Sequence, residues 1–239
     1  MSGKKSKAAV NNKFVGFIKE NLGIIAALAV MCIFLAVFPA TSSSFLTPKN
    51  LFNILRQIST NMLLACGMTM VIILGGIDLS VGSIIALSGV ISAGCVARYG
   101  LPIPVALLVG VLIGLVIGSV NGGIIAFTTI PPFIVTLATM NVARGLAKVY
   151  TGGSPVTKEW QFLGAGYIGP VPVPVIIMIV VVIITAFIMN RTKMGRHIYA
   201  VGGNAQAAVF SGIKVSKVKF FVHAFSGVMA GLAGIILAS

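Results

Sequence analysis

Long apolar runs separated by short polar segments make up most of the chain. The clearest runs are residues 22–38, 58–74, 80–97, 104–127, 133–149, 172–189 and 218–238. A helix that crosses the hydrocarbon core of a bilayer needs about 20 mostly apolar residues, and each run approaches that length. The pattern therefore predicts an all-α fold, a polytopic helical membrane protein with about seven transmembrane helices.

The runs differ in clarity. The third and the fifth are interrupted by Gly, Ser, Thr and Asn, which are typical of buried or pore-facing helices, so either run can be broken or re-entrant. The first run is similar to the apolar part of a signal peptide, but it is longer and further runs follow it. We therefore interpret it as a membrane anchor.

The distribution of Lys and Arg predicts the orientation. Eleven lie in the N-terminal tail and after the sixth run, on one side of the membrane, and six lie on the other side. The positive-inside rule assigns the richer side to the cytoplasm. The predicted organisation is a basic cytoplasmic tail (1–20) and a transmembrane domain (21–239), with a cytoplasmic loop at 190–217 and an external loop at 150–171 that holds Trp160.

The composition agrees with a lipid environment. Of 239 residues, 58% are hydrophobic and 8% are charged, and the mean hydropathy is +1.10. The net charge of +14 does not indicate nucleic-acid binding, because Lys and Arg lie between apolar runs rather than on a soluble basic face. Cys32, Cys66 and Cys95 lack the spacing of metal ligands, so we interpret them as packing residues.

Sequence motifs for catalysis are missing. The chain has no GxxxxGK[ST], HExxH or GxSxG motif, so we expect no enzyme and no nucleotide, metal or other cofactor site. Gly164, Gly166 and Gly169 spell GxGxxG, but a proline-rich run follows them, so they indicate a flexible external loop.

A glycine stripe marks the fourth run. Gly110, Gly114, Gly118 and Gly122 recur at every fourth position, on one side of the predicted helix. Such a stripe lets a neighbouring backbone approach closely. It predicts tight helix packing and says little about function.

Asp78 lies between the second and third runs, in the sequence GGIDLSVGS. A lipid-facing Asp at mid-membrane costs about 3 kcal/mol, so its side chain must face the cytoplasmic rim, the protein interior or water. We favour capping of the next helix by Asp78 or Ser80, or a rigid loop, over direct substrate contact. Both interpretations remain open.

Polar residues also run through the fourth and fifth spans, around Ile130-Pro131-Pro132. They can bind a polyhydroxylated solute or join helices by hydrogen bonds. A proton-coupled carrier would need buried titratable groups, and only Asp78 and His223 qualify. The candidate residues of a translocation path are Asp78, Ser80, Asn121, Thr136, Asn141 and Arg144.

The segment 192–217 carries the most specific pattern. Asn204 as a helix cap, small Ala residues after it and Gly212 as a stop predict a short helix between two glycine hinges. This helix has no charge, which favours docking into a protein groove over lying on lipid.

Four ordered stretches resemble a known family. GGIDLSVGS (75–83), IPPFIVTLATMNVARG (130–145), VYTGGSP (149–155) and GRHIYAVGGNAQAAVFSGI (195–213) are similar to the ribose-type permeases of bacterial ABC sugar importers. The resemblance covers residues 45–239. It implies a permease in the bacterial inner membrane, with a cytoplasmic N-terminus. It further implies a separate ABC ATPase, an external sugar-binding protein and a second permease copy as partners, with ribose, xylose and galactose-type sugars all possible.

The resemblance also implies roles for single residues. The family signature would fall on Gly76, Asp78, Leu79, Ser80 and Gly82, with no chemical role assigned. Relatives continue further, so we expect a fragment or a truncated gene, and Ala138 replaces a frequent Gly. A stand-alone carrier or channel, or a non-functional fragment, remains the alternative. The implied ATPase-coupling residues are Gly202, Gly203, Asn204, Ala207, Ala208, Ser211 and Gly212.

Overall fold

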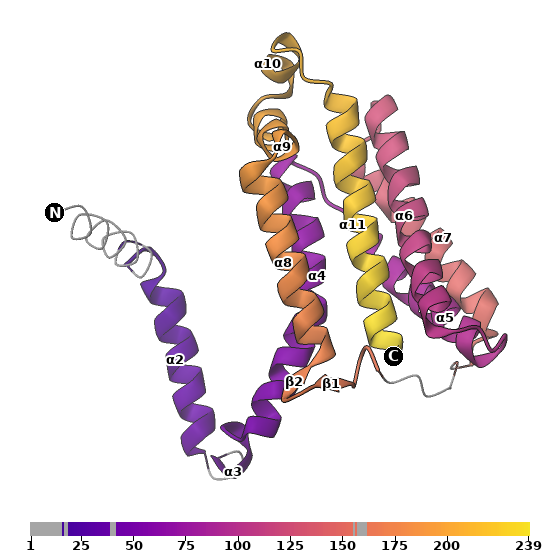
Figure 1. Cartoon of the computed structure of the whole chain (residues 1–239). Coiled ribbons are helices and arrows are strands. Elements are labelled where there is room, and N and C mark those ends of the chain that lie inside the picture. Colours follow the sequence, from indigo (N-terminus) through magenta and orange to yellow (C-terminus); the bar gives the residue numbers. More distant parts are fainter. Residues whose placement is uncertain (1–15, 17–18, 39–41, 155, 157–161) are drawn as a thin grey trace. The chain divides into compact units, whose positions relative to one another are not determined.

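Helices make up most of the described chain. A computed structural model describes residues 16, 19–38, 42–154, 156 and 162–239 (Figure 1). The helices are α2 (Leu22–Val37), α3 (Ser42–Phe45), α4 (Pro48–Ile73), α5 (Val81–Ala97), α6 (Ile103–Phe127), α7 (Pro132–Thr151), α8 (Val173–Arg191), α9 (Lys193–Gly203), α10 (Ala205–Phe210) and α11 (Val215–Ala238). The strands β1 (Tyr167–Ile168) and β2 (Val171–Pro172) pair antiparallel.

Each of the seven predicted apolar runs coincides with a helix, which confirms the polytopic all-α fold. Among the described residues, α6, α8 and α11 are long and apolar enough to cross a membrane. Helices α2 and α5 are apolar but shorter. The count of seven crossings therefore stays a prediction. The basic tail before residue 16, and Trp160, lie outside the described residues.

The chain divides into two compact units, Met1–Ile54 and Leu55–Ser239. In the first unit, no residue of α2 is buried, and large apolar side chains such as Ile24 and Val37 are 73% exposed. Such a surface suits lipid contact. Asn50 fixes the turn before α4, because its Nδ2 donates to the carbonyl oxygen of Phe45 at 2.9 Å.

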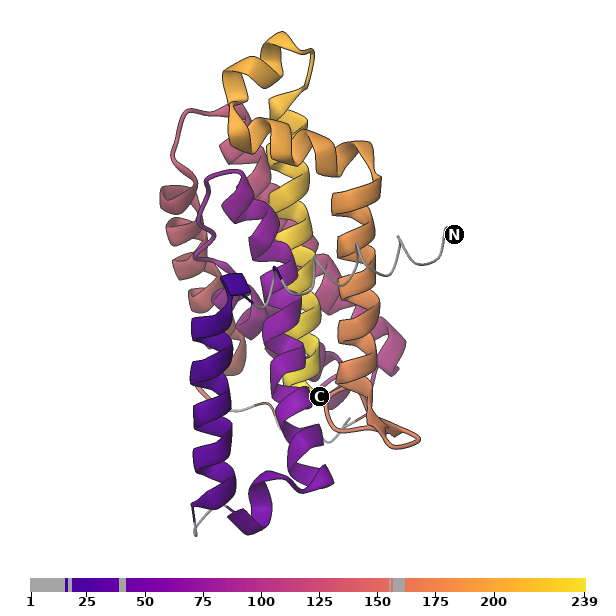
Figure 2. The ribbon, with the colours of Figure 1, turned by 90° about the vertical axis from the view of Figure 1, so that its left-hand side faces the viewer.

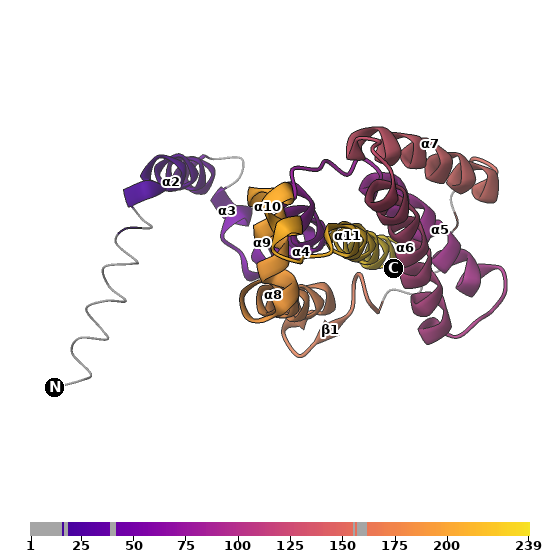
Figure 3. The ribbon, with the colours of Figure 1, turned by 90° about the horizontal axis from the view of Figure 1, so that it is seen from above.

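In the second unit, α11 is the central helix. It lies between α4 and α6 in the view along the bundle (Figure 3). Towards α4 and α8, Leu63 and Cys66 of α4 share a buried apolar cluster with Met229 and Ala233 of α11 and Val181 of α8. Helix α5 packs against both α11 and α6, and α7 lies outside α5 and α6.

The glycine stripe of α6 packs directly on α11, which confirms the predicted role. A Cβ at Gly118 would lie 2.5 Å from the carbonyl oxygen of His223, and one at Gly122 would lie 2.7 Å from that of Phe220. Gly227 and Gly231 of α11 contact α6 in the same way. Any side chain on these glycines would push the two helices apart.

The GxGxxG glycines do not form a featureless loop. Gly169 has φ +61° and makes the turn between β1 and β2, a conformation that favours glycine. A Cβ at Gly164 would lie 2.5 Å from the carbonyl oxygen of Ile236, so this glycine lets the loop lie against the end of α11. The strand pair was not predicted, because two residues per strand leave no readable alternation.

Candidate functional site

The chain between α4 and α5, residues 74–80, is irregular backbone in which buried side chains alternate with exposed ones. We call it the 74–80 segment. Gly75 has φ +75°, which turns the chain out of α4, and Asp78 and Ser80 are 2% and 0% exposed. Non-helical backbone in a membrane protein is tolerated where protein groups satisfy it. The Leu79 N–H accordingly donates to Thr136 Oγ1 of α7 at 3.1 Å.

Hydroxyl groups surround the carboxyl group of Asp78. Its Oδ1 accepts from the N–H and the hydroxyl of Ser80, at 3.0 and 2.5 Å, and its Oδ2 accepts from the hydroxyl of Ser226 on α11 at 3.1 Å. The bond to the Ser80 N–H closes an Asx turn. Asp78 thus ties the segment together and to α11, but the predicted capping of α5 is wrong for both side chains, because the Ser80 hydroxyl points back to Asp78.

The hydrogen bonds continue into α6 and α7. Asn121 Nδ2 donates to Ser80 Oγ at 2.9 Å, and Asn121 Oδ1 accepts from Thr139 Oγ1 at 2.6 Å. We call the connected side chains of Asp78, Ser80, Asn121, Thr139 and Ser226 the Asp78 network. The network joins the 74–80 segment to three helices. A displacement of the segment must therefore break these hydrogen bonds or move the helices with it.

The structure separates the predicted path residues into two groups. Asp78, Ser80, Asn121 and Thr136 are buried together. Asn141 and Arg144 are exposed on α7. Because residues three and four apart share a helix side, Asn141 and Arg144 form one polar outer side of α7.

A different outer side of α7 is apolar. Val142, Leu146 and Val149 lie three and four residues apart and are 61%, 53% and 82% exposed. Leu146 also lines a groove of about 300 Å³ with Leu112 and Val116 of α6, and the groove walls are entirely apolar. This side suits lipid, whereas the polar side does not.

Helices α9 and α10 lie at the same end of the bundle as the end of α4, and the strand pair β1–β2 lies at the opposite end (Figure 2). Asn204 caps α10, because its side chain accepts from the Ala207 N–H at 2.9 Å, and Gly212 follows the helix with φ +78°. The predicted short uncharged helix is confirmed. The predicted hinge at Gly202 and Gly203 is wrong, since both complete the last turn of α9 and the chain breaks at Asn204.

The implied coupling residues do not all face outward. Ala208 is 3% exposed and packs on Ile198 and Val201 of α9 and on Val218 of α11. Sequence reasoning missed Phe210, which is 91% exposed at the end of α10. The exposed members of the implied set are Gly202, Gly203, Asn204, Ala207, Ser211 and Gly212.

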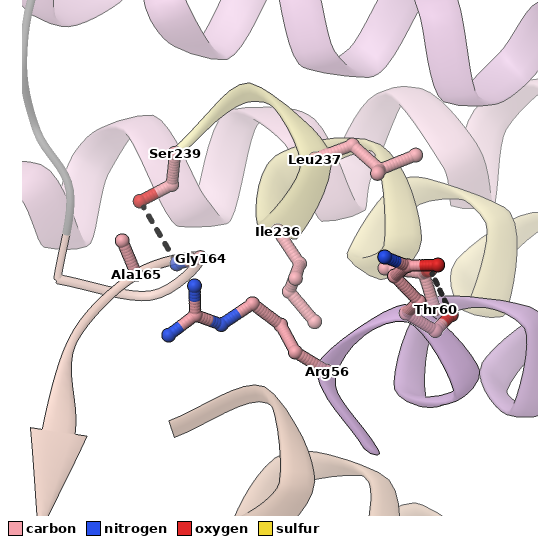
Figure 4. Close-up of a pocket in the computed structure, with 8 residues that line it drawn as sticks. Arg56, Thr60, Gly164, Ala165, Ile236, Leu237 and Ser239 are labelled. Carbon is pink, nitrogen blue, oxygen red and sulfur yellow. Dashed lines mark hydrogen bonds between the residues drawn. The ribbon is translucent and has the colours of Figure 1, made fainter. Parts of the chain in front are cut away.

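A cavity of about 370 Å³ opens at the other end of the bundle (Figure 4). Arg56 and Thr60 of α4 line one wall, Ile236 and Leu237 of α11 another, and Gly164 belongs to the loop. Arg56 Nη2 donates to the hydroxyl of Tyr167 at 2.8 Å. Isolated polar residues at one helix end gave no signal in the sequence.

Comparison with known proteins decides the family. A family model described as the permease component of a branched-chain amino acid transport system matches residues 50–239. The chain belongs to this permease family. It is therefore a component of a transport system and not itself an enzyme. The match includes the Asp78 network and α9 to α11.

Individual relatives are more specific. The ribose import permease protein RbsC of Bacillus subtilis is 43% identical over 227 residues, which cover 93% of this chain and 69% of that protein. RbsC of Haemophilus influenzae is 42% identical, over 93% of this chain and 70% of that protein. The xylose transport system permease protein XylH of H. influenzae is 31% identical, over 90% of this chain and 74% of that protein. No solved structure matches the chain.

Proposed function

We propose that the chain is the membrane-spanning permease subunit of an ATP-driven monosaccharide importer in the bacterial inner membrane. It pairs with a second copy, couples to a separate ABC ATPase and receives sugar from an external binding protein. Residues 1–20 and 190–217 face the cytoplasm, and 150–171 face outside. The observation that carries the proposal is α10, a capped, uncharged and exposed helix at the predicted cytoplasmic end.

The exposed side of α10 forms the ATPase contact in this proposal. Ala207 offers a small surface over which a partner backbone can pass, and Phe210 offers an apolar anchor at the helix end. A helix presented in this way fits a groove on a partner protein. Ala208 supports this contact from the buried side of the helix, because its side chain holds α10 against α9.

The polar outer side of α7 forms the wall of the path in this proposal. Asn141 lies ten residues into a helix of 20, far from both ends, and its side-chain amide is exposed. A lipid-facing polar group at this depth is costly, so water or the second copy must cover Asn141 and Arg144. In this proposal the Asp78 network does not line the path, and it joins the 74–80 segment to α6, α7 and α11 when the subunit changes conformation.

The substrate is a sugar of the ribose, xylose or galactose class rather than an amino acid. The ribose and xylose permeases to which the chain is similar transport sugars by name. The ammonium group of an amino acid must also be compensated when it leaves water, most strongly by a carboxylate. Among the described residues from Leu55 onward, Asp78 is the sole carboxylate side chain, and three hydrogen bonds already occupy it. Sugar hydroxyls need only neutral donors and acceptors, which Asn141 supplies.

Reconstitution tests this function. The chain, the ATPase and the binding protein are placed in vesicles, and uptake of labelled ribose and leucine is measured with and without ATP. We expect ATP-dependent uptake of ribose, and loss of both ATPase capture and uptake on Ala207→Asp. ATP-independent uptake would favour a stand-alone carrier or channel, uptake of leucine alone would overturn the sugar assignment, and no uptake at all would favour a non-functional fragment.

A further inference from the structure

The last turn of α9 lies directly against the last residue of α4. A Cβ at Gly202 would collide with the carbonyl oxygen of Ile73 and would lie 3.0 and 3.2 Å from its carbonyl carbon and Cγ2. The next residue, Gly203, has nothing within 4 Å of its Cβ position. Two neighbouring glycines in one helix turn therefore differ in kind: one is required by a close contact and the other is not.

Apolar packing surrounds this contact. Ala208 of α10, Ile198 and Val201 of α9, and Met70 and Val71 of α4 belong to one buried cluster. A displacement of α10 is therefore passed to α9 and to the end of α4, because a close-packed interior transmits strain.

Ile73 is also the point from which the 74–80 segment begins. The chain turns at Gly75 and reaches Asp78 five residues after Ile73. The contact between Gly202 and Ile73 thus lies at the junction of the α9–α10 unit and the segment that carries Asp78.

Resting on the proposed function, we infer that Gly202 is a positioning residue for coupling. It keeps α9 flush against Ile73, so that ATPase-driven movement of α10 reaches the 74–80 segment and the Asp78 network. This role differs from the ATPase contact that the family resemblance implied for Gly202, because the α-carbon faces Ile73 of the same chain. The ATPase contact proposed for the exposed side of α10 therefore does not include the contact between Gly202 and Ile73.

The test compares Gly202→Ala and Gly202→Val with Gly123→Ala and Gly123→Val in the complete complex. Gly123 of α6 also lies in a helix and has nothing within 4 Å of its Cβ position, so both pairs raise helix propensity but only the Gly202 pair meets a neighbour. Capture of the ATPase, ATP hydrolysis and sugar uptake are measured. We expect the Gly202 variants to capture the ATPase normally while sugar moved per ATP falls by about 2- to 30-fold. We expect the Gly123 variants to change that ratio by less than about twofold.

A variant at a second position distinguishes a loss of coupling from misfolding caused by the Gly202 substitutions. Gly75→Ala strains the positive φ without touching α9, and we expect it to give the same retained capture and reduced coupling. Equal coupling in the Gly202 and Gly123 variants would overturn the inference, and so would loss of capture on Gly202→Ala. If the unmodified chain captures no ATPase, the proposed function itself fails.

Discussion

Removing the Ser226 hydroxyl tests how much the Asp78 network stabilises the bundle. Ser226→Ala deletes the hydrogen bond that Asp78 Oδ2 accepts at 3.1 Å and leaves that oxygen buried. Leaving a buried acceptor without its hydrogen-bond partner costs about 1–3 kcal/mol in soluble proteins, and interhelical bonds in membranes reach about 1.7 kcal/mol. We therefore expect a loss of about 1–2 kcal/mol.

Ser59→Ala is the matched control. Ser59 is equally buried in a neighbouring helix, but its hydroxyl donates to the carbonyl oxygen of Leu55 in its own helix, at 2.7 Å. Such local bonds contribute little. Equilibrium unfolding in mixed micelles measures both variants. If Ser226→Ala destabilises the chain no more than Ser59→Ala does, the network is not the tie between α11 and the 74–80 segment that we describe.

Two further predictions follow from the helix surfaces. Gly118→Leu should destabilise the bundle by about 1–3 kcal/mol because it separates α6 from α11, whereas Gly123→Leu, with open space at its Cβ position, should not; thermal unfolding in detergent compares them. Asn141→Leu should lower ATP-dependent sugar uptake while ATPase capture is unchanged, whereas Val142→Leu on the apolar side should leave uptake normal. Uptake that survives Asn141→Leu would remove this side of α7 from the path.

The helices and the cap were readable from the sequence for a physical reason. Runs of about 20 apolar residues can satisfy their backbone in lipid only as helices, so each predicted run became one. Asn204 caps α10 through a contact three residues away, and a local contact of this kind leaves a local pattern. The prediction of a hinge at Gly202 was wrong because a glycine can permit either a bend or a close contact. Only the neighbouring residue in the fold, here Ile73, distinguishes the two.

The candidate site depended on contacts that span the chain. Ser226 lies 148 residues after Asp78, and no periodicity links them. The polar residues of the fourth and fifth predicted spans looked like one set in the sequence. Helix geometry instead turns Thr139 inward to Asn121 and turns Asn141 outward.

The sequence alone determined which segments must be helical, which segment forms a short, uncharged and capped helix, and that Asp78 cannot face lipid. These three results follow from local hydrogen bonding and from the cost of polar groups in hydrocarbon. Only the tertiary structure decided which groups satisfy Asp78, which side of α7 stays open and why Gly202 has no side chain. Those outcomes depend on which helices become neighbours, and packing between distant segments sets that choice.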